Sequence, residues 1–418
     1  MSNMQNMIRC GFICILFMVY GVEAQVASVG PPKPPLGKRW VLNPDFSDEF
    51  NGTELDTTKW LNYHPTWIGR PPGLFMPSQV SVKDGFLQIK GEKMKQDTIV
   101  HAYGKDIVFN IKGGAVVSKK AAFLGYYECR VKAAATSMST TFWFSGNNVT
   151  GPKGCDQYSQ EWDIQECIGK QGDFKGSYFA SGMHSNAHYW YNDCEGERHD
   201  YRASQVRFEN EEVASKDFHV YGGWWRDALH ASYYYDNRAP KHQKFFDSIS
   251  SKPMNTPMYM RLVCETYPFP WISLPTDEEL ADDTKNTVYY DWVRGYELVD
   301  VHESTTLKPE ALIKIYDEGV YFEQSVLQVK STNKLKIPLT YKANVDRTVT
   351  LKLLNEEGKM VAQKKFTAHA GYANMEFDFE LLQVPKRSSN YKLVSHMCIK
   401  EQKDQILDIN TIIINLKN

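Results

Sequence analysis

Three acidic side chains lie close together in the segment SQEWDIQECIG, which spans residues 159–169. Alternate side chains of a β-strand point to the same face, so Glu161 and Asp163 share a face. Glu166 is five positions after Glu161 and would point to the opposite face of a regular strand. A β-bulge inserts one extra residue and returns Glu166 to the first face. We therefore predict a bulged strand whose three carboxyl groups line one cleft.

Crowded carboxyl groups of this kind are suited to the hydrolysis of glycosidic bonds. Adjacent like charges resist joint ionisation, so one glutamate can stay ionised while the other keeps its proton. The ionised group attacks the anomeric carbon, and the protonated group donates to the leaving oxygen. Asp163, which lies between the two glutamates, can hydrogen-bond the nucleophile and help to hold the proton on the acid. A solvated acidic edge strand or a calcium site explains the same spacing, so the surrounding sequence has to decide.

The elements around this motif have the sequence pattern of short strands. Runs rich in Val, Ile, Tyr, Phe and Thr recur, as in GFLQIKGE, TTFWFSG and YMRLVCETY, and turn-forming residues separate them. Long helical periodicity is nearly absent, and no repeat of fixed period is visible. The pattern predicts an all-β protein built as a sandwich.

The distribution of tryptophan indicates a second domain. All ten Trp lie between Trp40 and Trp292, whereas strand-like runs continue after Val301. We predict a boundary near residues 300–307, with residues 307–418 forming a small immunoglobulin-like β-sandwich. Sugar-binding modules usually need exposed aromatic residues, so the absence of Trp favours a spacer or packing role for this accessory domain.

The N-terminus has the pattern of a secretion signal. One Arg precedes the apolar run GFICILFMVYG, and small residues precede a cleavage point after Ala24. We therefore predict a signal peptide at residues 1–24, a Pro-rich linker at 25–36 and a secreted mature chain, periplasmic or extracellular. An uncleaved membrane anchor is the alternative.

Six cysteines remain after the predicted signal peptide. Cys155 and Cys194 lie in polar, loop-like stretches and are the candidates for a disulfide in an oxidising compartment. The remaining cysteines lie in apolar, strand-like runs that favour buried free thiols. Their spacing does not suit zinc, so no metal or cofactor is expected, although a structural calcium ion stays open.

The overall charge favours neither nucleic acid nor a membrane as partner. The chain has 48 Lys and Arg against 50 Asp and Glu, which gives a formal net charge of −2. The motifs GxSxG, HExxH, GxxxxGK[ST] and GxGxxG after a strand are absent, which disfavours the enzyme classes that use them. We expect a monomer that acts on a polysaccharide.

Several stretches together resemble glycoside hydrolase family 16 over about residues 40–300. They are FSDEFNGTELDTTKW, TTFWFSG, the bulged ExDxxE form EWDIQE, DFHVYGGWW with ASYYYDNRA, and YYDWVRGYEL, in the family's order. The resemblance implies that residues 37–300 form a jelly-roll, concanavalin-like catalytic domain with an endo-acting, retaining mechanism. By position, Glu161 is then the nucleophile, Asp163 the assisting carboxylate and Glu166 the acid/base. Trp162 departs from the usual aliphatic residue and is expected to point away from the cleft.

A further resemblance concerns the agarase and porphyranase branch of that family. In HPTWIGRPPGLF, Trp67 and Arg70 match a pair that flanks a negative subsite, and the Arg fork suits a sulfate ester. The stretches HSNAHYW and CETY, with the Trp-bearing strands above, supply further candidates. The predicted substrate contacts are Trp67, Arg70, Trp143, Asn186, His188, Trp225 and Glu265. Arg70 as a surface residue, His188 and Trp143 as core residues, and Trp224 in place of Trp225 are the competing interpretations.

The sequence therefore predicts a secreted endo-acting hydrolase of β-1,4-galactosidic bonds in red-algal galactan. Arg70 favours porphyran, which carries sulfate, over agarose, which has an anhydro-sugar instead. The alternatives are a β-agarase, a β-1,3 or mixed-linkage glucanase, and a galactan-binding protein on the same fold that has lost catalysis. The presence of all three acidic residues disfavours the last of these.

Overall fold

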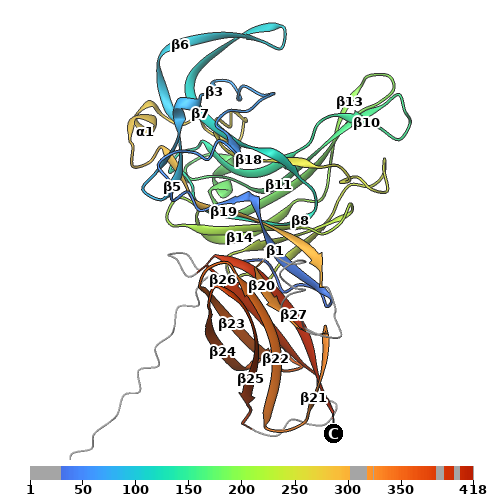
Figure 1. Ribbon diagram of the computed structural model, residues 1–418. Helices are drawn as coiled ribbons and strands as arrows, with labels where there is room; N and C mark the ends of the chain where they lie inside the picture. The colour runs from blue at the N-terminus through green and yellow to red at the C-terminus, as the bar shows by residue number, and fades with distance from the viewer. Residues whose placement is uncertain (1–29, 302–317, 323, 383–389, 400–404, 418) are drawn as a thin grey trace, which may run out of the picture.

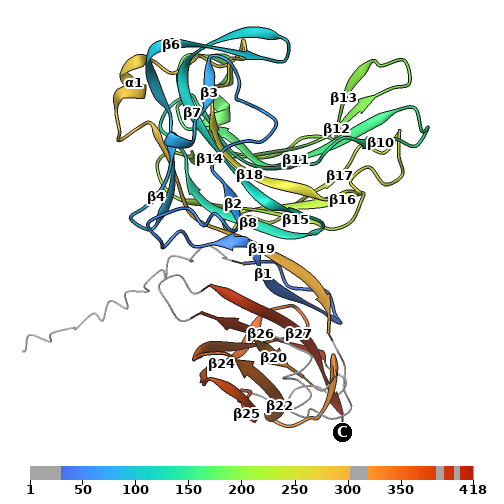
Figure 2. The ribbon, with the colours of Figure 1, turned by 45° about the horizontal axis from the view of Figure 1, so that its top comes forward.

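The computed structural model describes residues 30–301, 318–322, 324–382, 390–399 and 405–417, and its regular elements are almost all strands (Figure 1). Two β-sandwiches follow one another along the chain, and the larger N-terminal one consists of two facing sheets (Figure 2). The predicted all-β jelly-roll sandwich is confirmed. The predicted signal peptide, the first part of the linker and most of the predicted boundary region lie outside the described residues.

The first sheet of the large sandwich carries the acidic strand, and we call it the cleft sheet. Its hydrogen-bonded order is β13-β12-β11-β9-β18-β7-β2, with β3, β6, β10 and β14 attached beside this path. Its strands are β2 (Trp60–Leu61), β3 (Gly73–Phe75), β6 (Glu92–Ala102), β7 (Lys105–Ala122), β9 (Ser139–Ser145), β10 (Val149–Thr150), β11 (Gln157–Ile168), β12 (Ser181–Asn192), β13 (Arg198–Arg202), β14 (Val206–Val213) and β18 (Met258–Glu265).

The second sheet, which we call the outer sheet, has the order β17-β16-β15-β8-β19-β1 in the large sandwich, with β5 beside β19 and β4 beside β5. Its strands there are β1 (Lys38–Asp48), β4 (Val80–Lys83), β5 (Phe86–Lys90), β8 (Gly125–Lys132), β15 (His219–Trp225), β16 (His230–Tyr235), β17 (Lys241–Lys244) and β19 (Thr287–Asp300). The helices are the short η1 (Pro77–Gln79), η2 (Lys175–Ala180) and α1 (Asp277–Ala281).

Aromatic side chains fill the space between the two sheets. Trp162 of β11 is fully buried, and its ring centroid lies 6.1 Å from those of Trp225 and Tyr233 on the outer sheet. Its indole N–H donates to the Tyr233 hydroxyl at 2.8 Å. Trp162 therefore points away from the cleft, as predicted. The prediction that Trp225 contacts substrate is wrong, because the alternation along β15 directs this fully buried side chain into the core.

The outer sheet continues into the C-terminal sandwich. Strand β1 pairs with β27, and β26, β23 and β24 extend the sheet, while β21 also pairs with β27. A small sheet of β20, β22 and β25 covers the other side of this sandwich core. The strands are β20 (Gly319–Tyr321), β21 (Val326–Lys330), β22 (Lys334–Ala343), β23 (Arg347–Leu354), β24 (Met360–Ala368), β25 (Gly371–Glu380), β26 (Asn390–Cys398) and β27 (Ile406–Lys417).

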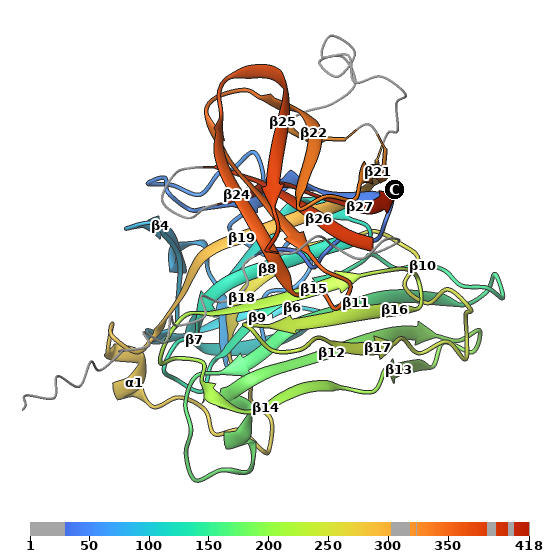
Figure 3. The same cartoon turned by 90° about the horizontal axis from the view of Figure 1, so that it is seen from below.

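The junction between the sandwiches is buried. Arg39 of β1 and Asp408 of β27 form an ion pair at 3.1 Å with almost no exposed surface. Trp40 packs beside Ile409 in the same junction, and its indole N–H donates to the Pro32 carbonyl at 2.7 Å. Seen from below, the C-terminal sandwich lies in front of the outer sheet, over β19 and β8 (Figure 3), and the strand that it pairs with is β1. The two units are thus joined by strand pairing as well as by the chain.

The predicted disulfide is present between Cys155, just before β11, and Cys194, just after β12. It ties together the ends of two neighbouring strands of the cleft sheet. As predicted, Cys129, Cys167 and Cys264 are buried free thiols, whereas Cys398 is partly exposed and not buried as expected. Within the described residues, each helix is too short or too polar to cross a membrane.

Candidate active site

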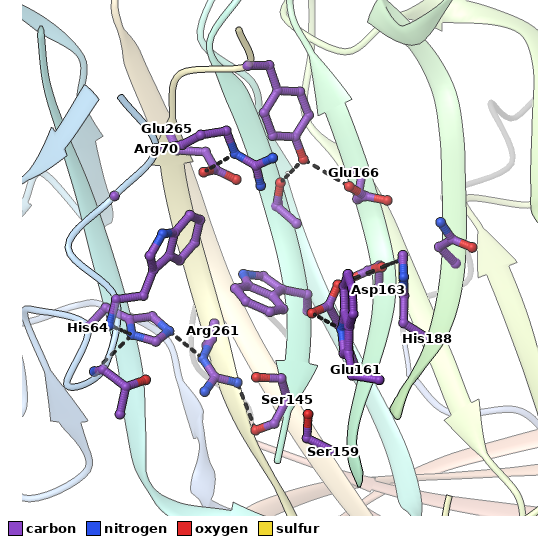
Figure 4. Close-up of a pocket in the computed structure, with 18 of the residues that line it drawn as sticks. His64, Arg70, Ser145, Ser159, Glu161, Asp163, Glu166, His188, Arg261 and Glu265 are labelled. Carbon is purple, nitrogen blue, oxygen red and sulfur yellow. Dashed lines mark hydrogen bonds and ion pairs between the residues drawn. The ribbon is translucent and has the colours of Figure 1, made fainter. Parts of the chain in front are cut away.

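The acidic strand β11 contains the predicted bulge. Asp163 pairs with Trp143 of β9, and Gln165 pairs with the next residue, Phe142, so Ile164 has no partner on that strand. The extra residue shifts the alternation, and Ile164 remains in the core. The side chains of Glu161, Asp163 and Glu166 therefore gather on the same side of the sheet (Figure 4).

These carboxyl groups line a cavity of about 910 Å³ on the cleft sheet. On one side of β11 the wall includes Trp67, Arg70 and side chains of β18, and on the other it includes side chains of β12 and β13. Because the lining extends to both sides of the carboxyl groups, the cleft can hold sugar units on both sides of a bond. This arrangement suits cleavage within a chain.

Glu161 has two partners that stabilise its ionised form. Its Oε2 accepts a hydrogen bond of 3.1 Å from the indole N–H of Trp190, a group that can only donate. Nε2 of His188 lies 3.8 Å from its Oε1. Burial raises the pKa of Glu161, and the positive charge of His188 and the Trp190 hydrogen bond oppose this effect. A fixed donor and a nearby cation are the surroundings that a carboxylate nucleophile needs.

Glu166 lies in surroundings that favour its protonated form. Burial raises its pKa to about 7, and the negative charge of Asp163 contributes to the same effect. The Tyr267 hydroxyl donates to Oε1 of Glu166 at 2.9 Å and moderates the rise in pKa. At neutral or mildly acidic pH a large fraction of Glu166 therefore carries a proton, as a general acid requires.

His188 is held as a cation between three carboxylates. Its Nδ1 lies 2.7 Å from Asp200, and its Nε2 lies 3.5 Å from Asp163. Burial alone would lower the pKa of His188, but hydrogen bonds and charges from Asp163, Glu161 and Asp200 raise it to about 10. Arg202 in turn donates to Asp200. The imidazolium offsets the negative charge that Glu161 and Asp163 bring into the cleft.

Asp163 is the most deeply buried of the three acidic side chains of β11 that line the cleft. Burial raises its pKa to about 6, the charge of Glu161 adds to the rise, and His188 opposes it. The ionisation of Asp163 is thus linked to that of Glu161 and of Glu166, its acidic neighbours on β11. This linkage fits the predicted role of Asp163 as the group that assists the other two.

Arg70 lies inside a cage of aromatic rings. Its guanidinium carbon lies 5.6 Å from the ring centre of Trp67, 5.4 Å from that of Tyr267 and 4.9 Å from that of Phe269. Its Nε lies 3.3 Å from Glu265, whose pKa burial raises to about 7 while Arg70 lowers it. In the part of the chain that the structure describes, no other carboxylate pairs with Arg70, so its terminal nitrogens are open to a ligand.

Trp67 and Trp143 form an aromatic corner of the cleft, with ring centres 6.2 Å apart and planes at 83°. Arg261 of β18 stacks over Trp143 at 4.8 Å and donates to the Ser145 carbonyl at 2.8 Å. These contacts fix the indole of Trp143 against the sheet. Flat apolar rings at this position can support the apolar face of a sugar.

The structure brings all but one of the predicted site residues together. The residues that line the cleft with the three carboxyl groups are Trp67, Arg70, Trp143, Asn186, His188 and Glu265. Trp225 is the exception and belongs to the core. Trp190 and Tyr267 were missed. Trp190 lies two residues after His188 on β12 and so shares its face. Tyr267 lies two residues after Glu265, just beyond the end of β18. Asp200 gave no signal, because its role depends on the pairing of β12 with β13.

Two groups of side chains have potential metal ligands within 4.8 Å of one another among the described residues. The first is Glu161, Asp163 and His188 in the cleft, where Nε2 of His188 lies 3.8 Å from Glu161 and 3.5 Å from Asp163. The second is Asp193, Glu197 and His199 in the β12–β13 turn. There Asp193 accepts hydrogen bonds from the backbone of residues 195 and 197 and lies 3.0 Å from His199. Contacts within the protein explain both arrangements.

Comparison with known proteins gives matches along most of the chain. Residues 40–298 match the model of the GH16 domain of β-porphyranases A–D, and residues 320–409 match the porphyranase-associated domain. β-Porphyranase D of Zobellia galactanivorans is 62% identical over 390 residues, which cover 93% of this chain and 91% of that protein. β-Porphyranase B of Phocaeicola plebeius is 39% identical over 287 residues, which cover 65% and 89% of the two chains.

Solved structures agree with these matches. The crystal structure of a β-porphyranase from the gut bacterium Bacteroides plebeius aligns with a TM-score of 0.60 and 38% identity, covering 65% of this chain and 96% of the other. Porphyranase B of Zobellia galactanivorans aligns with a TM-score of 0.56 and 32% identity, covering 66% and 100%. The sequence matches, the sandwich and the bulged acidic strand lead to one conclusion: this chain belongs to glycoside hydrolase family 16, in its β-porphyranase group, and is a glycoside hydrolase.

Proposed function

We propose that this protein is a secreted, endo-acting, retaining hydrolase of the β-1,4-galactosidic bonds of porphyran. The observation that carries the proposal is the 62% identity to a β-porphyranase over 93% of the chain, across both sandwiches. The cleft adds chemical support, because it presents one carboxyl group with fixed donors and another with a pKa of about 7. These are the two states that acid-assisted nucleophilic attack requires.

In the first step, Oε of Glu161 attacks the anomeric carbon of the galactose while Glu166 donates its proton to the leaving oxygen. The bond between that carbon and the oxygen breaks, and a covalent glycosyl–Glu161 ester forms. The hydrogen bond from the indole N–H of Trp190 to Glu161 weakens as this carboxylate loses its charge. His188, whose Nε2 lies 3.8 Å from Glu161 and 3.5 Å from Asp163, keeps the local charge balanced.

In the second step, Glu166 acts as the base. It takes a proton from a water molecule that has replaced the leaving sugar, and this water attacks the anomeric carbon. The ester to Glu161 breaks, and Glu166 regains its proton. Two displacements at the same carbon return the β configuration, so the product keeps the stereochemistry of the substrate.

The preference for porphyran over agarose rests on Arg70. Its guanidinium is fixed by three aromatic rings and faces the cleft next to Trp67. A guanidinium with open terminal nitrogens can bind a sulfate ester through paired, charge-assisted hydrogen bonds. An uncharged anhydro-sugar offers no anion for this site. If the substrate were agarose, Arg70 would bind no sulfate and would pair only with Glu265.

Secretion is supported by two independent features. The first 24 residues have the charge, apolar run and small residues of a cleavable signal. The disulfide between Cys155 and Cys194 suits an oxidising compartment outside the cytoplasm. We therefore propose that the mature chain acts on its polysaccharide as a monomer, in the periplasm or outside the cell.

The test is the release of reducing ends by the mature protein, residues 25–418, from porphyran, agarose, κ-carrageenan and laminarin in parallel. The proposal predicts release from porphyran and its loss in Glu161→Gln. Release from agarose with porphyran spared would establish the agarase alternative. Release from laminarin alone would establish a glucanase. Binding of galactan without release from any polymer would establish a non-catalytic binding protein.

A further inference from the structure

A second guanidinium lies on the side of the cleft opposite to Arg70. Arg198 is the first residue of β13, and its guanidinium carbon lies 4.7 Å above the ring centre of Trp190. The same Trp190 donates to Glu161 through its indole N–H. Both side chains line the cleft. One aromatic ring thus links Arg198 to the carboxylate that attacks the sugar.

The charge of Arg198 is not committed to another side chain. Four arginines line the cleft, namely Arg70, Arg198, Arg202 and Arg261. Arg70 pairs with Glu265, Arg202 pairs with Asp200, and Arg261 donates to backbone carbonyls. Throughout the described part of the chain, no carboxylate lies within ion-pair distance of Arg198. Stacking on Trp190 orders the guanidinium while leaving its donors open.

The chemistry of the substrate places an anion on this side. In porphyran, β-linked galactose alternates with a sulfated α-galactose, so cleavage of the β bond leaves galactose on the glycone side. The sugar that departs with the leaving oxygen is then the sulfated one. On the glycone side, the sulfated sugar is the second unit from the bond. One sulfate therefore lies on each side of the carboxyl groups.

We propose that Arg198, stacked on Trp190, binds the sulfate ester of the first sugar on the leaving-group side. The inference rests on the proposed function, and it extends that function from one sulfate site to two. Strand order supports the placement, because β13 lies beyond β12 on one side of β11 and the Arg70–Glu265 pair lies at β18 on the other. A planar guanidinium presents paired donors that match the oxygens of a sulfate group.

The products of digestion report directly on this site. Natural porphyran contains sulfated and anhydro units, and each cut turns the first leaving-side sugar into a new non-reducing end. The sugar second from the bond on the glycone side becomes the penultimate unit at the reducing end. Mass spectrometry of the oligosaccharides from a limited digest therefore reads the two sulfate sites separately.

The variants are Arg198→Gln, Arg198→Lys and the control Arg226→Gln. Arg226 is matched, because it also stacks on a tryptophan, Trp224, at 5.1 Å, but it does not line the cleft. We expect Arg198→Gln to lower kcat/KM on porphyran at least tenfold and to reduce the fraction of sulfated non-reducing ends. Arg198→Lys should retain part of the wild-type kcat/KM and part of the fraction of sulfated non-reducing ends. Arg226→Gln should match the wild type in both quantities. Equal thermal midpoints would exclude a folding defect.

Unchanged kcat/KM and an unchanged fraction of sulfated non-reducing ends in Arg198→Gln would overturn the inference. A loss of activity with the same end-group composition would also overturn it, because it would assign Arg198 a role in holding Trp190 only. Absence of porphyran cleavage by the wild type would refute the proposed function, and the second sulfate site with it.

Discussion

At the scale of single residues, the two glutamates of β11 differ in the hydrogen-bond partner that each one faces. Glu161 faces the indole N–H of Trp190, which stabilises a negative charge. Glu166 faces the hydroxyl of Tyr267, which can pair with a carboxyl group in either protonation state. The division of roles therefore follows from the neighbours and not from the glutamates themselves.

The first prediction is a bell-shaped dependence of kcat/KM on pH. Glu166 must be protonated, and its pKa of about 7 means that activity falls as the pH rises through about 7. Glu161 must be ionised, and its raised pKa means that activity falls as the pH drops into the acidic range. Initial rates on porphyran from pH 4 to pH 9 measure both limbs. A flat profile over that range would contradict the two-carboxylate mechanism.

The second prediction concerns Tyr267→Phe. The variant removes a hydrogen bond that stabilises the ionised form of Glu166, so the pKa of Glu166 should rise. A hydrogen bond to a charged group contributes about 1.5–3 kcal/mol, which corresponds to roughly one to two pH units. The alkaline limb should therefore move to higher pH by about that amount, with the acidic limb unchanged. An alkaline limb that stays in place or moves down would show that Glu166 does not control it.

Sequence reasoning at this scale succeeded where neighbours lie on the same strand. The three carboxyl groups, their bulge and the inward-facing Trp162 follow from alternation along one segment. Trp225 was misplaced because two tryptophans in succession leave the register of β15 open. The partners of His188 and Arg70 depend on pairing between distant strands and on loop conformation, which a single sequence does not encode in its local pattern.

At the scale of elements, the β12–β13 hairpin supplies one whole wall of the cleft. It carries His188 and Trp190 on one strand and Arg198 with Asp200 on the other. The disulfide joins Cys194, at the start of its turn, to Cys155 before β11. The hairpin is thereby fixed to the strand that carries the reacting carboxyl groups. Cys194 was recognisable from its polar surroundings, and Asn186 and His188 of β12 were predicted contacts, but the contribution of β13 to the cleft was not predicted.

The third prediction is that the double variant Cys155→Ser/Cys194→Ser loses stability and substrate affinity. A link between residues 39 positions apart restricts the unfolded chain by about 3–4 kcal/mol. We expect the free energy of unfolding to fall by about that amount and KM on porphyran to rise more than kcat falls. Urea denaturation and steady-state kinetics measure these quantities. A reducing agent should have no effect on the double variant, and equal stability with and without the disulfide would contradict the prediction.

At the scale of the whole molecule, one sheet passes through both sandwiches. The pairing of β1 with β27 and the buried ion pair of Arg39 with Asp408 make the second sandwich part of the same folded unit. The sequence indicated two β units from the distribution of tryptophan, but it gave no sign that their strands pair. A buried junction of this kind favours the packing role for the accessory domain over a separate sugar-binding role.

The fourth prediction is that Asp408→Asn destabilises both sandwiches together. The change removes the charge that faces Arg39 inside the junction, while the amide oxygen can still accept the hydrogen bond from the Val320 N–H. Removing one partner of a buried ion pair costs about 3–5 kcal/mol. Calorimetry should show a single unfolding transition for the wild type and a single, lower one for the variant. Two separate transitions in the wild type would contradict the shared folding unit.

The measurement that tests the central claim most directly is proton NMR of porphyran digestion, followed from the first seconds in deuterated buffer. A retaining mechanism through Glu161 predicts that the new reducing-end galactose appears first as the β-anomer and then equilibrates, and that Glu161→Gln releases none. An early excess of the α-anomer would mean inversion of configuration, and it would contradict the role of Glu161 as nucleophile.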